Sequence, residues 1–246
     1  MIHLIRSYRA HLKLTDPLTA FALLRGPVIR KNVHGIFMEV ESDIQLKRLK
    51  EKEPETVEWI RTRMKPGEVF FDVGACVGGY SLLAASRGIE VCAFEPAFQN
   101  YYSLLRNILL NGLKIQTLPV AVSDTTTLTT LSYSSMERGT AHHEIQGANH
   151  NAKKSLSVIS LSLDDAVKLL NIPQPDHLKI DTDGNEVAVL RGADETLQSV
   201  RTILMEIDES TGVHEKIKPY LTAFRLLSRF NKPKKDVYNA LFERVA

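Results

Sequence analysis

The sequence has few cysteines and no long hydrophobic run. Its two cysteines, Cys76 and Cys92, are too few for a disulfide framework, so we expect a reducing compartment. No segment reaches the roughly 18 consecutive apolar residues that cross a bilayer. The apolar stretch 18–24 is shorter, and Arg25-Gly26-Pro27 follows it instead of a small-residue cleavage site. These absences predict a cytoplasmic protein without a transmembrane segment.

The sequence also lacks a strong excess of charge of either sign. Its 31 basic and 29 acidic side chains give a net charge of +2, whereas a surface that binds nucleic acid needs a concentrated basic face. The short basic clusters at 25–31 and 232–235 are typical of solvated loops. We therefore expect no nucleic-acid partner.

Length and composition suit one main α/β domain. A chain of 246 residues with 43% hydrophobic residues can bury a full core. We place a helical extension with a hairpin near Val33–Glu41 at residues 1–52, and the main domain at 53–246. A stretch rich in Ser, Thr, His and Gly at 123–155 is read as an insertion. The extension is the expected contact surface of a homo-oligomer.

Strand-like and helix-like segments alternate through the main domain. Short apolar runs indicate buried strands, and longer stretches with a helical period indicate helices. The expected strands are 69–73, 90–94, 115–120, 127–133, 157–161, 177–181, 201–207, 224–230 and 237–244, and the expected helices are 54–64, 79–86, 99–110, 163–170, 185–197 and 213–222. This order predicts a doubly wound, mostly parallel seven-stranded α/β sheet with an antiparallel C-terminal hairpin.

Two strand ends carry residues typical of a nucleoside site. The apolar run 69–73 leads into a turn with Gly74 and Gly78, and a buried strand presents its backbone to a ligand in this way. The strand 90–94 ends at Glu95, about twenty residues after the glycines, where a carboxylate can reach the two hydroxyls of a ribose.

The spacing of the turn indicates which cofactor it holds. A dinucleotide fingerprint needs a glycine where this chain has Cys76, because that glycine lets a pyrophosphate lie against a helix N-terminus. Asp72, Gly74 and Gly78 form a wider turn that carries an acidic residue. Such a turn suits a cofactor without phosphates and with a cationic amino-acid end. S-adenosylmethionine is such a molecule.

Three carboxylates lie at the end of the strand 177–181 and just after it. Asp181 ends the strand and is expected to face the ligand crevice, whereas Asp183 and Glu186 start a helix, where acidic residues also serve as caps. Methylation of a hydroxyl needs a general base within hydrogen-bond reach. The candidates are Asp181, Glu186 and His142 of the pair His142-His143.

A metal ion is an alternative source of catalysis. Asp181, Asp183, Glu186, Glu206 and Asp208 supply oxygen ligands from two strand ends, enough for a magnesium ion that orients a diol. Nothing in their spacing requires a metal. We therefore assign no metal ligand, and magnesium is the less favoured alternative.

Four segments together match one known family. They are Phe71-Asp72-Val73-Gly74-Ala75 with Gly78, Phe94-Glu95-Pro96 with Asn100, Leu104, Asn107 and Asn111, Ala121-Val122-Ser123-Asp124, and the run from Leu178 to Ala193. With them the chain resembles the FkbM-type methyltransferases, a branch of the class I S-adenosylmethionine-dependent enzymes. The resemblance covers residues 53–246 and implies a Rossmann-like fold.

The resemblance also implies which residues bind the cofactor. Asp72, Gly74 and Gly78 would line its methionine end, Glu95 would bind the ribose hydroxyls, and the segment with Ala121, Ser123 and Asp124 would lie near the adenine. Ala75, Pro96 and Asn100 complete this set, as does Asp181 if it holds the methionine ammonium. Thr182 and Asp183 replace the usual apolar residue and Glu, and Cys76 replaces the usual Asn. These departures leave the substrate and the general base open.

The sequence thus predicts an S-adenosylmethionine-dependent methyltransferase. The resemblance implies O-methylation of a hydroxyl on a sugar, glycolipid or natural product, so the expected partner is a small molecule or glycan. The alternatives are a non-catalytic module that binds S-adenosylmethionine or a nucleoside, and a metal-assisted enzyme that acts on a diol. A methyltransferase of nucleic-acid bases would carry an Asn/Asp-Pro-Pro-aromatic loop where this chain has Asp181-Thr182-Asp183-Gly184.

Overall fold

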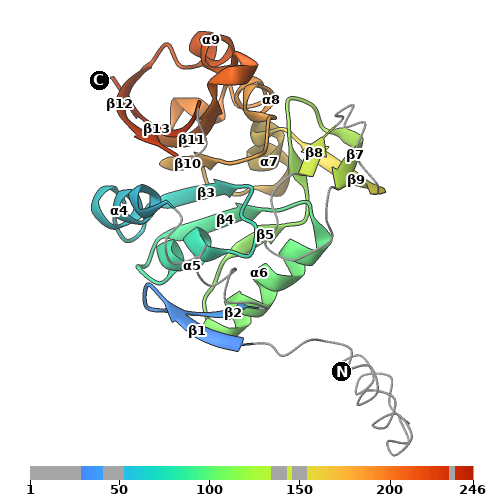
Figure 1. The fold of residues 1–246 in the computed structure, drawn as a ribbon, viewed down its shortest axis with the longest axis vertical. Helices are drawn as coiled ribbons and strands as arrows, with labels where there is room; N and C mark the ends of the chain where they lie inside the picture. Colours follow the sequence, from blue (N-terminus) through green and yellow to red (C-terminus); the bar gives the residue numbers. More distant parts are fainter. Residues whose placement is uncertain (1–28, 41–52, 134–142, 146–153, 233–235, 246) are drawn as a thin grey trace, which may run out of the picture.

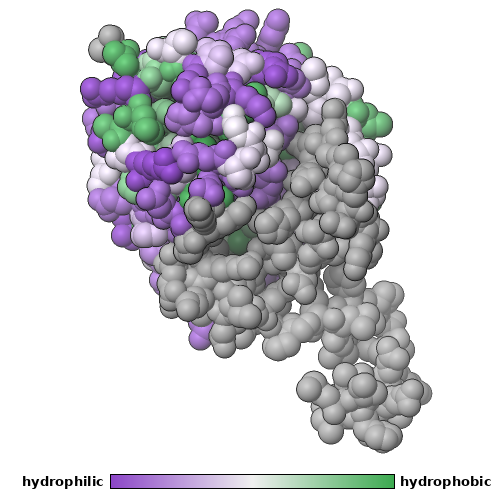
Figure 2. All heavy atoms as spheres, turned by 45° about the horizontal axis from the view of Figure 1, so that its top comes forward, coloured by the Kyte–Doolittle hydropathy of each residue, from purple (hydrophilic) through white to green (hydrophobic). Residues whose placement is uncertain are grey.

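A central sheet with helices on both faces forms the main body of the protein (Figure 1). The computed structural model describes residues 29–40, 53–133, 143–145, 154–232 and 236–245. Figure 2 shows one face of the molecule, where hydrophilic side chains predominate over the described residues. Within those ranges, no helix is long and apolar enough to cross a membrane.

The main sheet has seven strands in the order β12-β13-β11-β10-β3-β4-β5. Its strands are β3 (Val69–Val73), β4 (Glu90–Phe94), β5 (Gln116–Leu118), β10 (His177–Ile180), β11 (Thr202–Asp208), β12 (Phe224–Asn231) and β13 (Val237–Arg244). β13 runs antiparallel to both neighbours, and all pairs from β11 to β5 are parallel. The predicted fold class is confirmed. The strand order reverses between β3 and β10, where open α/β sheets hold their ligands.

The two faces of β3 explain why helices cover both sides of the sheet. Phe70 packs with α4 and α5, and its ring centroid lies 5.7 Å from that of Trp59. The next residue, Phe71, points to the opposite face and packs with residues of α7, α8 and α9. The helices of the first face are α4 (Pro54–Arg63), α5 (Gly79–Ala85) and α6 (Phe98–Asn111), and those of the second are α7 (Leu163–Leu170), α8 (Glu186–Arg191) and α9 (Val213–Ile217).

A second sheet corrects the expectation for the strand 157–161. This strand was expected within the alternating series of the main sheet, but it is part of β9 (Lys154–Leu161) in a four-stranded sheet of order β6-β9-β7-β8. The other strands are β6 (Ala121–Val122), β7 (Thr127–Tyr133) and β8 (His143–Ile145). β9 pairs with β7 along its whole length. Leu131 and Val158 pack on Ala97, so the second sheet has its own small apolar contact with the main domain.

The helix expected at 185–197 is shorter in the structure. α8 ends at Arg191, and the 3-10 helix η1 (Thr196–Gln198) follows separately. Gly192 lies between them, and a Cβ atom there would be 2.4 Å from the carbonyl oxygen of Ser123. The close approach of the two backbones therefore ends the helix.

Two asparagines of α6 hold the N-terminal hairpin, β1 (Ile29–Val33) and β2 (Ile36–Val40). Asn111 accepts from the N–H of Phe37 at 2.8 Å and donates to its carbonyl at 2.7 Å. Asn107 accepts from the N–H of Glu39 at 2.8 Å and donates to the carbonyl of Val77 at 2.9 Å. The sequence analysis expected this hairpin at Val33–Glu41, but it already begins at Ile29. Asn107 links the hairpin to Val77, in the loop that precedes α5.

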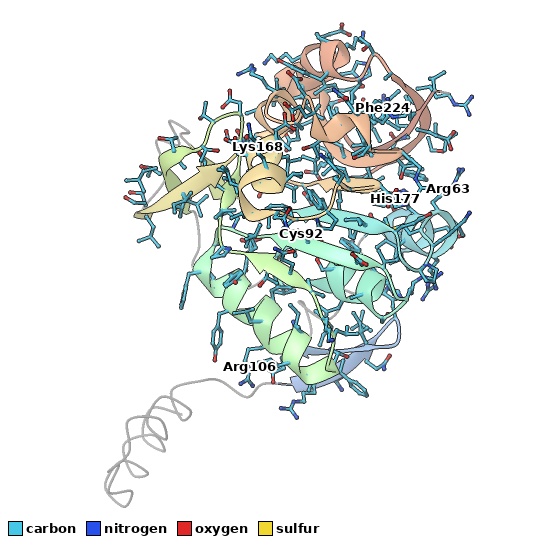
Figure 3. The ribbon with its side chains drawn as sticks, turned by 180° about the vertical axis from the view of Figure 1, so that it is seen from behind. Arg63, Cys92, Arg106, Lys168, His177 and Phe224 are labelled. Atoms are coloured by element: carbon cyan, nitrogen blue, oxygen red, sulfur yellow. The ribbon has the colours of Figure 1, made fainter. Side chains whose placement is uncertain are left out.

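A buried histidine links α4 to the amino ends of the strands. Figure 3 labels His177 and Arg63 of α4, and the ring centroid of His177 lies 6.1 Å from that of Trp59 in the same helix. Nε2 of His177 lies 2.9 Å from Glu68, and Nδ1 lies 2.7 Å from the hydroxyl of Thr202, which accepts from Trp59 Nε1 at 3.0 Å. His177 and Arg201 bond to Glu68, and with a backbone bond they outweigh burial and lower the pKa of Glu68 to about 2. Because Glu68 is then ionised, Nε2 donates to it and Nδ1 accepts from Thr202.

We expect the free energy of unfolding to decrease as the pH is lowered below about 6.5, the usual pKa of histidine. Burial lowers the pKa of His177 in the folded state, although Glu68 opposes this effect. The unfolded chain therefore binds the proton first, and stability falls by up to about 1.4 kcal/mol per pH unit until the folded pKa is reached. Urea unfolding between pH 5 and 8 measures this slope, and His177→Gln should reduce it. An unchanged slope in that variant would contradict the assignment.

Candidate active site

The register of the main sheet brings the predicted acidic residues together. Lys179 of β10 pairs with Asp72 of β3. Asp181 extends β10 by one hydrogen bond, from its N–H to the carbonyl of Val73 at 3.0 Å. Glu95 follows β4 on the other side of β3. The carboxyl ends of three adjacent parallel strands thus carry Glu95, the glycine turn and Asp181 at the point where the strand order reverses.

The glycine turn needs a glycine at position 74. Gly74 has φ +83°, and a Cβ atom there would lie 1.9 Å from the carbonyl oxygen of Asp181. The turn is tied to β4, because Gly74 donates its N–H to the carbonyl of Phe94 at 3.0 Å. Gly78 has φ +89°, and a Cβ atom there would lie 2.4 Å from the side chain of Leu104. Both glycines therefore let the backbone pass where no larger residue fits.

Glu95 is a buried carboxylate held by backbone groups. Its Oε2 accepts from the N–H of Cys76 and its Oε1 from the N–H of Ala97, each at 2.8 Å. Burial raises the pKa of Glu95 to about 7, against the effect of these bonds and one from Asn100. The carboxylate has about four lone-pair sites, and these three bonds leave one of them. The group is therefore fixed in place and suited to accept from a further hydroxyl.

A buried lysine stands between Asp72 and Asp181, and these three residues are called the Lys179 cluster. The ammonium of Lys179 lies 2.9 Å from Asp181 Oδ2. Burial disfavours this ammonium, but Asp181 and Asp72 outweigh burial and raise the pKa of Lys179. Asp72 is fully buried, accepts from the Ser81 hydroxyl at 2.5 Å, and has a pKa raised by burial. Its Oδ1 lacks a hydrogen-bond partner in the described part of the chain.

A second lysine forms a similar arrangement, called the Lys232 cluster, with Glu53 and Glu206. The ammonium of Lys232 lies 2.7 Å from Glu53 Oε1 and also contacts Glu206 Oε2. Tyr80 connects the two clusters: its hydroxyl donates to Glu53 at 3.0 Å, and its ring centroid lies 5.3 Å from the ammonium of Lys179. Residues that are distant in the sequence thus form one polar layer at the carboxyl edge of the sheet.

Glu186 braces the turn after β10. Its Oε1 accepts from the N–H of Gly184 at 3.0 Å and from the hydroxyl of Thr182 at 3.1 Å. Burial raises its pKa, although these bonds oppose the shift. Asp183 lies in the same turn with φ 52°. Through these contacts Glu186 stabilises the turn after β10. Its assignment as the general base stays a prediction.

The remaining predicted residues lie around this centre. Ala75 and Asn100 are buried, and Pro96 is half-buried beside Glu95. Ala121 lies in β6 and Ser123 follows it, both buried, whereas Asp124 pairs with Arg191 at 2.7 Å. His142 lies outside the described residues. These assignments to the cofactor and the acceptor stay predictions.

The described residues offer no ready metal site. No group of three or more His, Cys, Asp or Glu side chains among them is placed to hold an ion. Asp208 accepts from the N–H of Ser210 at 3.0 Å at the start of the 3-10 helix η2 (Glu209–Thr211), and Glu206 contacts Lys232. The assignment of no metal ligand stays a prediction.

The sequence analysis missed four residues of the polar layer: Lys179, Lys232, Glu53 and Tyr80. Lys179 carried a usable signal, because a lysine inside a buried parallel strand needs carboxylates around it. Glu53 and Lys232 carried none, because their contact joins two loops that are distant in the sequence.

Comparison with known proteins identifies the family. The methyltransferase FkbM domain matches residues 72–231, more than half of the chain. The hexuronic acid methyltransferase AglP of Haloferax volcanii is 23% identical over 217 residues, which are 87% of this chain and 87% of that protein.

Solved structures show the same fold. A methyltransferase FkbM from Methylobacillus flagellatus superposes with a TM-score of 0.53 at 14% identity, over 77% of this chain and 48% of that one, so this chain spans about half of its length. A tRNA (uracil-54, C5)-methyltransferase of Pyrococcus abyssi, solved with S-adenosyl-L-homocysteine, gives a TM-score of 0.53 at 13% identity, over 89% of this chain and 44% of that one. The fold agrees with the domain match, and the chain belongs to the FkbM family of methyltransferases.

Proposed function

We propose that the protein transfers a methyl group from S-adenosylmethionine to a hydroxyl of a sugar, glycolipid or natural product. One observation carries the proposal: Glu95 and Asp181 flank the Gly74 turn at the strand-order reversal of a methyltransferase domain. The name of the Haloferax volcanii relative supports a sugar acceptor.

The residues present fit this cofactor. Glu95 keeps one lone-pair site after accepting from Cys76, Ala97 and Asn100, which matches a hydroxyl of a ribose. The Lys179 cluster contains one ammonium and two carboxyl groups, and its partly exposed carboxylate, Asp181, is placed to attract a cationic methionine end. When bound, S-adenosylmethionine supplies a methyl carbon already activated by its sulfonium.

The protein then has to orient the acceptor and remove its proton. Asp181 is the partly exposed carboxylate of the Lys179 cluster, with 20% of its side chain exposed. It is placed to accept from an acceptor hydroxyl that approaches the methyl carbon in line. Lys179 fixes one oxygen of this carboxylate at 2.9 Å, which limits its rotation.

Cofactor binding should strengthen as the pH rises from 6 to 8. Ionised Glu95 accepts from a ribose hydroxyl, and its pKa of about 7 means that a proton competes below neutrality. The affinity should therefore fall by up to tenfold per pH unit below about 7. Calorimetry with S-adenosylmethionine at pH 6, 7 and 8 measures this dependence.

The matched variant for this test is Glu95→Gln. It keeps the shape of the side chain but loses the charge-assisted bonds. At pH 8 its free energy of binding S-adenosylmethionine should therefore be weaker by about 1.5–3 kcal/mol. The part of the pH dependence that comes from Glu95 should also disappear. Wild-type affinity in Glu95→Gln would remove the ribose assignment.

A further inference from the structure

If the proposed function holds, the acceptor approaches Asp181 from the side opposite to the cofactor. Glu95 and the Gly74 turn lie on the β4 side of Asp181. A cofactor on these residues fills that side, and in-line transfer requires the acceptor to approach from the opposite direction. On that side β11 follows β10 in the sheet, and Lys232 is close enough to Asp181 for their charges to interact.

In the Lys232 cluster, Lys232 and Glu206 are partly exposed to solvent and Glu53 is buried. The side chains of Lys232 and Glu206 are 15% and 26% exposed, whereas that of Glu53 is 3% exposed. The ammonium of Lys232 has three N–H donors. Among the described residues, two of them serve the carboxylates of Glu53 and Glu206, and the third is open to a ligand. The Oε1 atom of Glu206 takes no part in its ion pair with Lys232.

Glu53 fixes the position of this ammonium. It accepts from the hydroxyl of Tyr80 at 3.0 Å and from that of Thr56 at 3.4 Å, in addition to its 2.7 Å contact with Lys232. Its own backbone is in the left-handed region, with φ 56°. A buried carboxylate with this many partners has little freedom, so Lys232 is held in place before any ligand arrives.

We propose that Lys232 and Glu206 bind two neighbouring hydroxyl groups of the acceptor ring. Lys232 donates its remaining N–H to one hydroxyl, and Glu206 accepts from the next. One ammonium among two carboxylates leaves a net negative charge, which suits neutral hydroxyls and disfavours a carboxylate. The acceptor at this position is therefore a neutral polyhydroxylated ring. Lys232 is its specificity-determining residue, and Glu53 is a positioning residue.

The test measures whether Lys232 recognises one particular hydroxyl. The probes are 4-nitrophenyl glycosides of glucose, galactose and mannose, the monodeoxy analogues of whichever is methylated, and 4-nitrophenyl glucuronide. Release of S-adenosylhomocysteine gives kcat and KM. The wild type should prefer a neutral glycoside to the glucuronide, and one deoxy analogue should have a KM about 10- to 100-fold higher than its parent.

Lys232→Met should remove this preference. Its KM for the parent glycoside should rise by about 10- to 100-fold to match that of the deoxy analogue, while its affinity for S-adenosylmethionine stays at the wild-type value. A purely structural lysine would alter the melting temperature without changing the ratio between the two glycosides. Lys218→Met is the matched control, because that ammonium pairs with Glu215 on the surface.

The outcomes separate this inference from the proposed function. Methyl transfer to a glycoside with an unchanged parent-to-deoxy ratio in Lys232→Met would overturn the inference and leave the function in place. A wild-type preference for the glucuronide that Lys232→Met abolishes would overturn the neutral acceptor. Cofactor binding without transfer to any of these glycosides would overturn both the sugar acceptor and the inference.

Discussion

Gly74→Ala should abolish cofactor binding while leaving the protein folded. A Cβ atom at this position would lie 1.9 Å from the carbonyl oxygen of Asp181, and both sides of this contact are backbone. The turn or the end of β10 must move by more than 1 Å to reach an ordinary contact distance of about 3.5 Å. Misplacement of about 1 Å costs on the order of 10²-fold in rate in well-oriented sites, and we expect a loss of affinity for S-adenosylmethionine of the same order.

The control separates the clash from the cost of the backbone conformation. Gly67 has φ +85°, close to the φ +83° of Gly74, but nothing lies within 4 Å of the Cβ position. Gly67→Ala therefore bears a similar cost of about 1 kcal/mol for its left-handed backbone. It should lower the melting temperature slightly and leave cofactor affinity unchanged. Equal affinities in the two variants would show that contact with Asp181 does not determine the turn.

The sequence predicted the strands on either side of the glycine turn better than the contacts that complete the candidate site. Residues 69–73 and 90–94 match β3 and β4, because buried parallel strands are almost continuously apolar. Gly74 and Gly78 lie in the strand-to-helix turn of that region, and the fixed geometry of such a turn made both glycines recognisable in the sequence. Local chemistry was therefore enough to place Glu95 and Gly74.

The strand 157–161 shows what a local pattern leaves undetermined. Its sequence indicates a strand, and the structure forms one, but as part of β9 in the second sheet. A short strand has several partners with which it can hydrogen-bond, so its period does not specify its sheet. The Lys232 cluster was missed for a related reason, since Glu53 and Lys232 meet only through tertiary packing.

Asp181→Asn should lower kcat by about 10²–10⁴ while changing the affinity for S-adenosylmethionine little, because an amide of the same shape cannot accept the acceptor's proton. The change also leaves Lys179, which pairs with Asp181 at 2.9 Å, without one of its counter-charges. Asp72 remains as its other counter-charge. The melting temperature of Asp181→Asn therefore measures the structural part of the effect.

The matched control for Asp181→Asn is Asp183→Asn, two residues further along the same turn. Asp183 has φ 52°, and asparagine accepts this conformation as readily as aspartate, so the backbone is not strained by the change. Asp183→Asn should keep kcat within about threefold of the wild type, a change of about 0.65 kcal/mol in the barrier.

The division between kcat and affinity decides what Asp181 does. A large fall in kcat with normal cofactor affinity identifies it as the base that takes the acceptor's proton. A larger loss of cofactor affinity than of rate would mean that its charge holds the methionine ammonium. Normal rate and normal affinity in Asp181→Asn would exclude both assignments. Glu186, whose buried carboxyl has a raised pKa, would then be the next candidate for the base.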